Sequence, residues 1–273
     1  LTGFSVQRKE PLSGGCVGEV YKVSLSNNKT VVAKVGEVGS GLAIEGMMLE
    51  YLAQNSAFPV PDVLYADDNL LLMTWVPSGG TLDTSVQINA ADLVASLHQI
   101  SDSHFGFSSD TVIGGLKQTN SQTKSWLVFF AQHRLLNMAL QSLEVGNLPI
   151  GMMGRIEKCS QNLDKWLKEP DQPSLIHGDM WAGNVLADRG RITAFIDPAI
   201  YFADPEIELA FTTLFSTFGD AFFSRYHEHR QIQPGFFEER KDLYNLYPLL
   251  VHVRLFGGSY VGSVDTILKK FGF

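Results

Sequence analysis

Apolar residues in the first part of the chain come in short runs separated by turns. The runs 20–23 and 30–35 flank a polar Ser-Asn-Asn-Lys turn, and this pattern predicts a β-hairpin. Over residues 41–54 the apolar spacing changes to three and four, which predicts one helix. The residues on its inner face are Leu42, Glu45, Leu49 and Leu52.

Strand-like runs resume at 63–65 and 70–75 and then stop at a break. Pro77-Ser78-Gly79-Gly80 follows directly, and such a Pro/Gly-rich segment is typical of a connection. We therefore expect two lobes, a nucleotide-binding lobe at 1–76 and a catalytic and substrate lobe at 77–273.

The second lobe is predicted to be mostly helical. Its apolar positions recur with helical spacing, and Asn89 is a possible N-cap. Two short strands, 184–187 and 192–196, flank a turn, and Pro248 is expected to interrupt the last helical stretch. The predicted helices cover 89–100, 126–140, 206–218 and 236–273.

Composition narrows the class of protein. The chain has 273 residues, 45% of them hydrophobic, and a net charge of −8, which predicts a folded acidic protein. Nucleic acid and anionic membranes are excluded as main partners, because phosphate binding uses clustered Lys and Arg. No apolar run is long enough to cross a bilayer. With no visible secretory signal and only Cys16 and Cys159, we expect a cytoplasmic location.

The strongest chemical signal is the segment His177-Gly178-Asp179-Met180-Trp181-Ala182-Gly183-Asn184, which has the H-x-D-x-x-x-x-N spacing of a kinase catalytic loop. In such a loop the carboxylate orients the acceptor hydroxyl, and the amide oxygen holds a metal ion on the phosphates. Asp197 follows an apolar strand, where a second metal-binding carboxylate is expected. Burying three such polar groups without a ligand costs about 1–3 kcal/mol each, which favours function.

Upstream features occur in the order found in kinases. Gly14, Gly15 and Cys16 lie in a Gly-rich turn whose backbone N–H groups can approach phosphates. Lys34 ends the strand Val31-Val32-Ala33-Lys34, and Glu45 on the next helix is its candidate ion-pair partner. Each residue alone has an ordinary structural explanation, and the shared order favours a functional one. No Walker-type loop is present.

The chain resembles the fructosamine kinase (ketosamine kinase) family over most of its length. This resemblance implies an α+β, two-lobed protein-kinase-like fold, also seen in aminoglycoside phosphotransferases, with a small antiparallel sheet lobe and a larger helical lobe. The discriminating parts are the stretch from Phe105-Gly106-Phe107 to Gln118-Thr119-Asn120 and Trp181 within the catalytic loop, because related kinase families share the His-Gly-Asp and Asp-Pro signals. The resemblance also rests on Ile113-Gly114, Trp126, Arg134-Leu135, Asp197-Pro198-Ala199-Ile200-Tyr201, Glu206-Ile207-Glu208 and Tyr244-Asn245-Leu246-Tyr247.

The resemblance implies an ATP-dependent kinase that phosphorylates the third-carbon hydroxyl of a ketosamine, after which the product releases its amine. It assigns Asp179 as the catalytic base, Asn184 and Asp197 as Mg²⁺ ligands, and Lys34, positioned by Glu45, as the phosphate contact. The implied nucleotide site also takes Gly14, Gly15, Cys16, Met73, Thr74, Trp75 and Val76. The acceptor is a small-molecule ketosamine or a glycated protein amine.

Several interpretations stay open at this point. Trp181 could wall the acceptor pocket or pack beneath it, and Tyr201, Asp204 and Glu206 are candidates for acceptor contacts. The segment Phe202-Ala203-Asp204-Pro205 departs from the family pattern near the expected acceptor side. Cys16 could make activity redox-sensitive, which leaves a monomer or a Cys16-linked homodimer. Alternatives are phosphorylation of an aminoglycoside or choline, and a catalytically silent nucleotide-binding protein.

Overall fold

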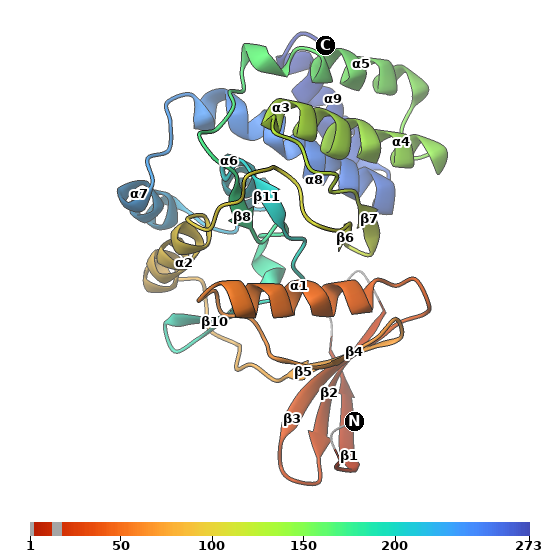
Figure 1. Cartoon of the computed structure of the whole chain (residues 1–273), viewed down its shortest axis with the longest axis vertical. Coiled ribbons are helices and arrows are strands. Elements are labelled where there is room, and N and C mark those ends of the chain that lie inside the picture. Colours follow the sequence, from red (N-terminus) through yellow and green to blue (C-terminus); the bar gives the residue numbers. More distant parts are fainter. Residues whose placement is uncertain (1–2, 13–17) are drawn as a thin grey trace.

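The computed structural model describes residues 3–12 and 18–273 and has two lobes (Figure 1). The smaller lobe is a five-stranded antiparallel sheet in the order β1-β2-β3-β5-β4 with one helix across it. Its elements are β1 (Val6–Pro11), β2 (Glu19–Leu25), β3 (Thr30–Val35), α1 (Leu42–Asn55), β4 (Val63–Ala66) and β5 (Leu70–Thr74). The predicted hairpin and helix are therefore confirmed.

Strand alternation decides what each face of the sheet carries. On β3, Val31 and Ala33 face one apolar cluster, whereas Val32 and Lys34 point to the side covered by α1. On the inner face of α1, Leu42 and Leu49 pack against β5, and Leu52 is buried in the main hydrophobic core, so the helix stripe expected from the sequence is buried. As a result Glu45, which shares that face, lies beside Lys34.

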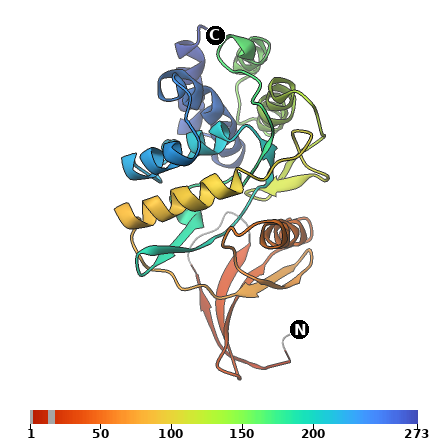
Figure 2. The same ribbon diagram turned by 60° about the vertical axis from the view of Figure 1, so that its left-hand side comes forward.

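The larger lobe is mainly helical, with three small two-stranded sheets among the described residues (Figure 2). Its elements are α2 (Thr84–Leu97), β6 (Thr111–Ile113), β7 (Leu116–Gln118), α3 (Trp126–Phe129), the π-helix η1 (Phe130–Leu136), α4 (Asn137–Glu144), α5 (Ile150–Ser160), η2 (Leu163–Lys165), β8 (Ser174–Ile176), η3 (Ala182–Asn184), β9 (Val185–Asp188), β10 (Arg191–Phe195), β11 (Tyr201–Ala203), α6 (Glu206–Leu214), α7 (Asp220–His229), the π-helix η4 (Phe236–Arg240), α8 (Lys241–Phe256) and α9 (Ser259–Lys270). The predicted fold class is confirmed.

The aromatic stripe that begins at Trp126 belongs to the core of this lobe. Trp126, Phe129 and Phe130 are fully buried, and the indole N–H of Trp126 donates to the hydroxyl of Tyr244 at 3.0 Å. That bond satisfies the one polar atom of the indole. The stripe therefore stabilises the lobe and does not face a ligand.

Two local predictions are wrong. Helix α2 begins at Thr84, because the Asp83 carboxylate accepts from the backbone N–H groups of Ser85 and Val86 and caps it there. Asn89 instead accepts from the backbone N–H of Ile192 at 2.9 Å, which ties α2 to β10.

Pro248 does not end a helix either. It lies inside α8, which runs on to Phe256. The interruption comes at Gly257 and Gly258, which both have a φ of 60°, a backbone region that favours glycine.

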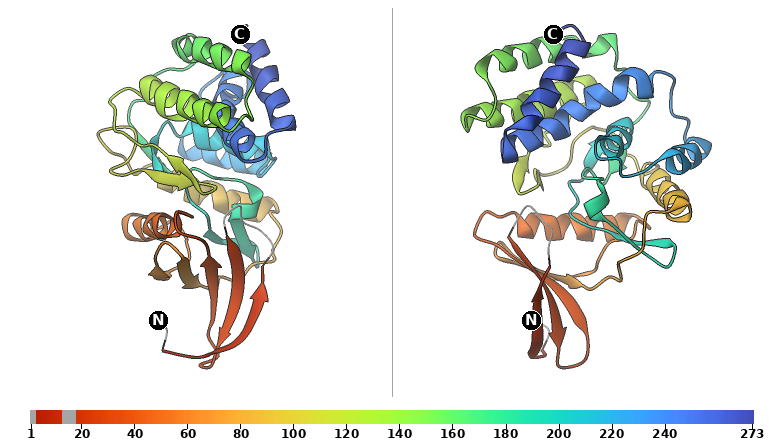
Figure 3. Two further views of the ribbon diagram at one scale, coloured as in Figure 1. Left: turned by 90° about the vertical axis from the view of Figure 1, so that its right-hand side faces the viewer. Right: turned by 180° about the vertical axis from the view of Figure 1, so that it is seen from behind.

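The connection between the two lobes, which includes residues 77–80, packs against the larger lobe. The backbone N–H of Gly80 donates to the carbonyl of Ala187 at 2.8 Å, and the Thr193 hydroxyl donates to the carbonyl of Pro77 at 2.7 Å. Seen from the side and from behind, β9 and β10 approach this connection at the junction of the lobes (Figure 3). No helix in the described part of the chain has the length and hydropathy that a bilayer crossing needs.

Candidate active site

The segment from His177 to Asn184 forms a loop between β8 and β9. Gly178 has a φ of +87°, and a Cβ placed there would lie 2.2 Å from the carbonyl oxygen of Ala199. Only glycine can take this position, because any other residue would be strained and would collide with backbone. The close approach brings the loop against the segment that follows Asp197.

Asp179 and Asn184 are joined directly. The Asn184 Nδ2 donates to the backbone carbonyl and to the Oδ2 of Asp179, both at 2.9 Å. Burial, reinforced by the negative charge of Asp197, raises the pKa of the Asp179 carboxyl to about 7. A carboxyl with a pKa near neutrality is suited to act as a general base.

Asp197 is fixed by its neighbours in the chain. The backbone N–H of Ile196 donates to the backbone carbonyl of Asn184 at 3.0 Å, and that of Ala199 donates to the backbone carbonyl of His177 at 2.7 Å. Asp197 itself has a φ of 54°, a conformation that aspartate tolerates better than most residues. These bonds place its carboxylate beside the catalytic loop.

Lys34 links the two lobes through ion pairs. Its Nζ lies 2.5 Å from Oε1 of Glu45 and also pairs with Oδ1 of Asp197. Burial acts to lower the pKa of Lys34, but the two carboxylates outweigh it and raise the pKa above its usual value. Burial raises the pKa of the Glu45 carboxyl, and Lys34 opposes this effect. A charged Lys34 therefore faces the cleft.

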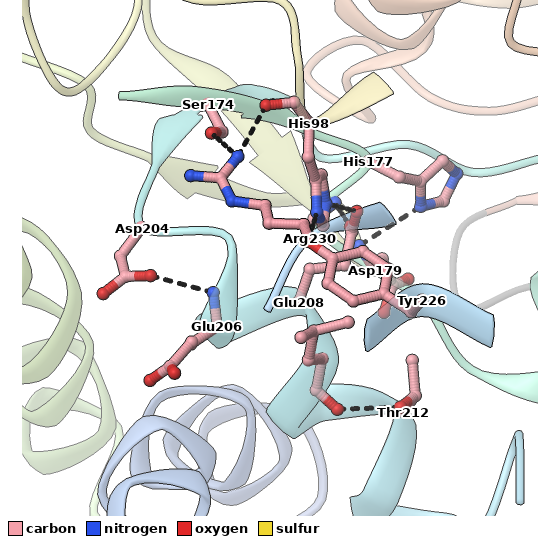
Figure 4. Close-up of polar contacts among 12 residues, drawn as sticks. His98, Ser174, His177, Asp179, Asp204, Glu206, Glu208, Thr212, Tyr226 and Arg230 are labelled. Atoms are coloured by element: carbon pink, nitrogen blue, oxygen red, sulfur yellow. Dashed lines mark hydrogen bonds and ion pairs between the residues drawn. The ribbon is translucent and has the colours of Figure 1, made fainter. Parts of the chain in front are cut away.

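Behind the loop lies a buried polar cluster that the sequence motifs did not assign (Figure 4). Glu208 on α6 accepts from the backbone N–H of Gly178 at 2.7 Å, and its other oxygen is 2.9 Å from Nε2 of His98. The Nδ1 of His98 is 2.7 Å from the hydroxyl of Tyr226 on α7. This cluster fixes the residue that precedes Asp179. In the sequence, the only sign of this cluster was that Glu208 falls on the apolar face of a predicted helix, a position that ordinary core residues also occupy.

His177 itself is an internal group. Its Nδ1 accepts from the backbone N–H of Asp179 at 3.3 Å, and its ring lies beside the stacked pair Phe58 and Phe195, with its centroid 6.1 Å from each. Burial lowers the pKa of His177, so the imidazole is neutral at pH 7. Its role is to hold the loop.

A pocket of about 400 Å³ opens between the lobes beside Lys34. Met73, Thr74, Trp75 and Val76 line one side of it. Its apolar walls come from Val20, Val32, Leu186 and Ile196. The flat base of a nucleotide fits between such walls. Lys34, Asn184 and Asp197 also line this pocket, where they can contact the phosphates of the nucleotide.

A second, smaller pocket of about 60 Å³ adjoins the first. It shares Lys34, Trp181, Asn184 and Asp197 with the larger pocket and adds Asp179, Glu45 and the turn Gly114–Gly115. Trp181 is 40% exposed and lies where the two pockets meet. This position agrees with a pocket wall and not with packing beneath the loop.

The other predicted acceptor residues do not line these two pockets in the described part of the chain. Tyr201 is buried with the Arg134 guanidinium 3.8 Å from its ring centroid. Asp204 accepts from the Tyr244 hydroxyl at 2.7 Å, and Glu206 makes a two-point ion pair with Arg240 at 2.6 and 2.7 Å. Their contacts are structural. Gly14, Gly15 and Cys16 lie outside the described residues.

The donor set fits one hard cation held together with phosphates. Asn184 uses Nδ2 for both bonds to Asp179, which leaves its amide oxygen for a metal ion, and Asp197 lines the same pocket with one of its carboxylate oxygens paired to Lys34. Oxygen atoms are the ligands that Mg²⁺ prefers, and it usually takes only one or two from protein side chains when it binds a nucleotide. Within the described ranges, no group of three or more His, Cys, Asp or Glu could hold a metal without phosphate.

The fold and this cleft define the class of protein. The structure superposes on an aminoglycoside phosphotransferase solved with ADP and hygromycin B, with a TM-score of 0.69 at 16% identity over 98% of this chain and 96% of that one, which shows a shared protein-kinase-like fold. The fructosamine kinase family model matches residues 1–271. The chain belongs to the fructosamine kinase family.

Individual relatives agree with this assignment. A protein of Synechocystis sp. named "Probable ketoamine kinase" is 34% identical over 98% of this chain and 91% of its own length. A protein-ribulosamine 3-kinase of rice, described as chloroplastic, is 29% identical over 99% of this chain and 79% of its own. A fructosamine-3-kinase homologue from Thermobifida fusca has a TM-score of 0.88 at 29% identity, covering 98% of this chain and 94% of that one.

Proposed function

We propose that the protein is an ATP-dependent ketosamine kinase that phosphorylates the third-carbon hydroxyl of a sugar bound to an amine. One observation carries the proposal: Lys34, Asp179, Asn184 and Asp197 converge at the junction of a large apolar-walled pocket and a small polar one. Family membership and the names of the relatives support the ketosamine as the acceptor.

Asp179 supplies the base in this reaction. Its Oδ2 is engaged by Asn184, so Oδ1 can accept the proton of the sugar hydroxyl. That hydroxyl oxygen forms a bond to the γ-phosphorus while the bond from phosphorus to the ADP oxygen breaks. Lys34, held by Glu45, orients the phosphates and offsets their charge.

ATP and Mg²⁺ are the proposed cofactors. Asn184 and Asp197 would hold the metal, which when bound neutralises phosphate charge. Met73, Thr74, Trp75 and Val76, with Gly14, Gly15 and Cys16 of the Gly-rich turn, would complete the nucleotide site. Trp181 is the proposed wall on the acceptor side, because it lines both pockets.

The test is an ADP-release assay with Mg-ATP and a panel of acceptors. We expect ADP production that depends on a ribulosamine or a fructosamine, and phosphorus NMR of the product should show a phosphate ester on the third carbon. Turnover with only an aminoglycoside or choline would move the assignment to another acceptor class. ATP binding without ADP release for any acceptor would favour a silent binder.

A pH dependence follows from Asp179. A base must be ionised, and the pKa of Asp179 in the free enzyme is raised to about 7. We therefore expect kcat/KM for the ketosamine to fall about tenfold per pH unit below that pKa and to level off above it. A profile that stays flat from pH 5.5 to 8.5 would contradict this assignment of the base.

Location and assembly complete the proposal. A reducing, cytoplasmic setting suits the buried free thiol of Cys159, whose pKa burial raises to about 12. Cys16 is the thiol to test for redox control or a linked homodimer. If reducing agent changes neither activity nor mass on a non-reducing gel, both the redox switch and the Cys16-linked homodimer are wrong.

A further inference from the structure

The β6–β7 hairpin of the larger lobe lies over one end of helix α1 (Figure 1). Its two-residue turn, Gly114–Gly115, lines the smaller pocket together with Asp179 and Trp181. None of the catalytic motifs includes this hairpin, yet it forms the side of that pocket away from the nucleotide site.

The turn presents backbone to the pocket. Gly114 and Gly115 have φ values of 54° and 77°, and two consecutive positive φ values are typical of the tight turn that joins paired strands. A side chain at either position would be strained and would project a Cβ from the wall. The wall therefore offers main-chain N–H and carbonyl groups, which suit the hydroxyls of a sugar.

A buried glutamine fixes the hairpin to the segment that carries Asp197. Gln118 donates from Nε2 to the Thr111 hydroxyl at 2.8 Å and to the carbonyl of Ala199 at 3.0 Å. Its Oε1 accepts from the Tyr247 hydroxyl at 2.6 Å. Both N–H groups and the oxygen of this amide are satisfied, so its orientation is specified.

The network extends to a buried cation. Asn120 donates to Thr111 at 2.8 Å and accepts from Nη2 of Arg134 at 2.7 Å. Arg134 is fully buried, and within the described residues it has no carboxylate partner. Burying such a charge is costly, and the hydrogen bonds of its guanidinium to the Thr119 carbonyl and to Asn120 fix the segment that follows β7.

The hairpin also contacts the smaller lobe. A Cβ placed on Gly41, the residue before α1, would lie 2.9 Å from Cγ1 of Val112. Gly41 has a φ of +84°, and its lack of a side chain allows Val112 this close approach. Glu45 follows one helical turn later. The hairpin thus bridges the helix of the ion pair and the segment of Asp197.

We propose that the β6–β7 hairpin is the acceptor-specificity element of this enzyme: the sugar of the ketosamine packs against the Gly114–Gly115 turn, and Gln118 is the positioning residue that holds the turn in place. This inference rests on the proposed function and names the wall that discriminates among polyhydroxylated amine-linked acceptors. It does not involve the nucleotide pocket.

The test compares Gln118→Leu with Gln122→Leu, the same chemical change at an exposed position outside the network. We expect Gln118→Leu to raise KM for a ketosamine about tenfold and to change the ratio of kcat/KM between a ribulosamine and a fructosamine about threefold or more, with KM for ATP nearly unchanged. Gln122→Leu should behave like the wild type.

Gly115→Ala is the second variant, because it alters the wall and leaves the buried network intact. It should raise the ketosamine KM in the same direction. Two results overturn the inference: folded variants with unchanged ketosamine kinetics, or equal rises in the KM values of ATP and ketosamine. If Gln118→Leu does not fold, Gly115→Ala decides alone. A wild-type protein that phosphorylates no ketosamine would instead overturn the proposed function, and the inference with it.

Discussion

Replacing the carboxylate of Asp179 by an amide, Asp179→Asn, is expected to lower kcat by about three orders of magnitude or more, because the acceptor hydroxyl loses its base. Nucleotide affinity should change little, since Lys34 and the apolar pocket remain. The measurement is steady-state ADP release together with a binding titration of ATP. Asp171→Asn, the same chemical change at an exposed position outside the loop, is the matched control.

Although Asp179→Asn is expected to lower activity, it should increase the stability of the fold above pH 7. The folded pKa of Asp179 is about 7, well above that of an unfolded aspartate, so the folded state binds the proton more tightly. The stabilisation this provides is present at low pH and is lost as pH rises, which leaves an ionised carboxylate that costs the fold free energy above pH 7. Because Asp179 is only half-buried and lines a pocket, water offsets part of this cost, and we expect Asp179→Asn to raise the free energy of unfolding by about 1–3 kcal/mol at pH 8. A variant that is both inactive and less stable would point to a structural role.

Spacing along the chain predicted the catalytic part of the site because its members are local. Asp179 and Asn184 belong to one loop, and Asp197 follows the next hairpin, so short connections hold them together. Lys34 and Glu45 could be paired because one strand and one helix face each other in a small lobe. These arrangements depend on few residues and on short stretches of chain, so the sequence alone is enough to predict them.

The remaining part of the site depends on the packing of distant segments. Val20 and Leu186 line the larger pocket, yet apolar strand residues look the same in sequence whether they face a core or a ligand. Tyr201 and Asp204 follow Asp197 closely in the chain, but β11 turns inward to pair with β8 and buries them. Nearness in sequence to Asp197 thus does not bring Tyr201 and Asp204 to the wall of either pocket, whereas the Gly114–Gly115 turn of a separate hairpin lines the smaller one.

Glu208→Ala is expected to destabilise the fold by about 3–5 kcal/mol, because it leaves buried partners without a hydrogen bond. Both oxygens of the Glu208 carboxylate are used, one by the backbone N–H of Gly178 and one by His98, and the side chain is 2% exposed. Glu208→Gln keeps an oxygen for Gly178 and a polar group for His98, so its loss should be about 1 kcal/mol. Chemical denaturation of both variants, with exposed Glu157→Ala on α5 as the control, gives the comparison.

The dependence of stability on pH in the acid range also tests the role of Glu208. Burial acts to raise the pKa of Glu208, but the hydrogen bond and charge of His98, with the bond from Gly178, outweigh it and hold the pKa below its usual value. Glu208 therefore stabilises the fold above the pKa of an unfolded glutamate, and this contribution is lost as pH falls through the lower folded value. The stability difference between wild type and Glu208→Gln should shrink as pH falls below about 4.

Because Gly178 precedes Asp179, Glu208→Gln should also lower kcat more than it changes KM for ATP, an effect that a group acting on stability alone would not produce. Equal stability of Glu208→Ala and wild type at pH 7 would show that α6 does not anchor the catalytic loop.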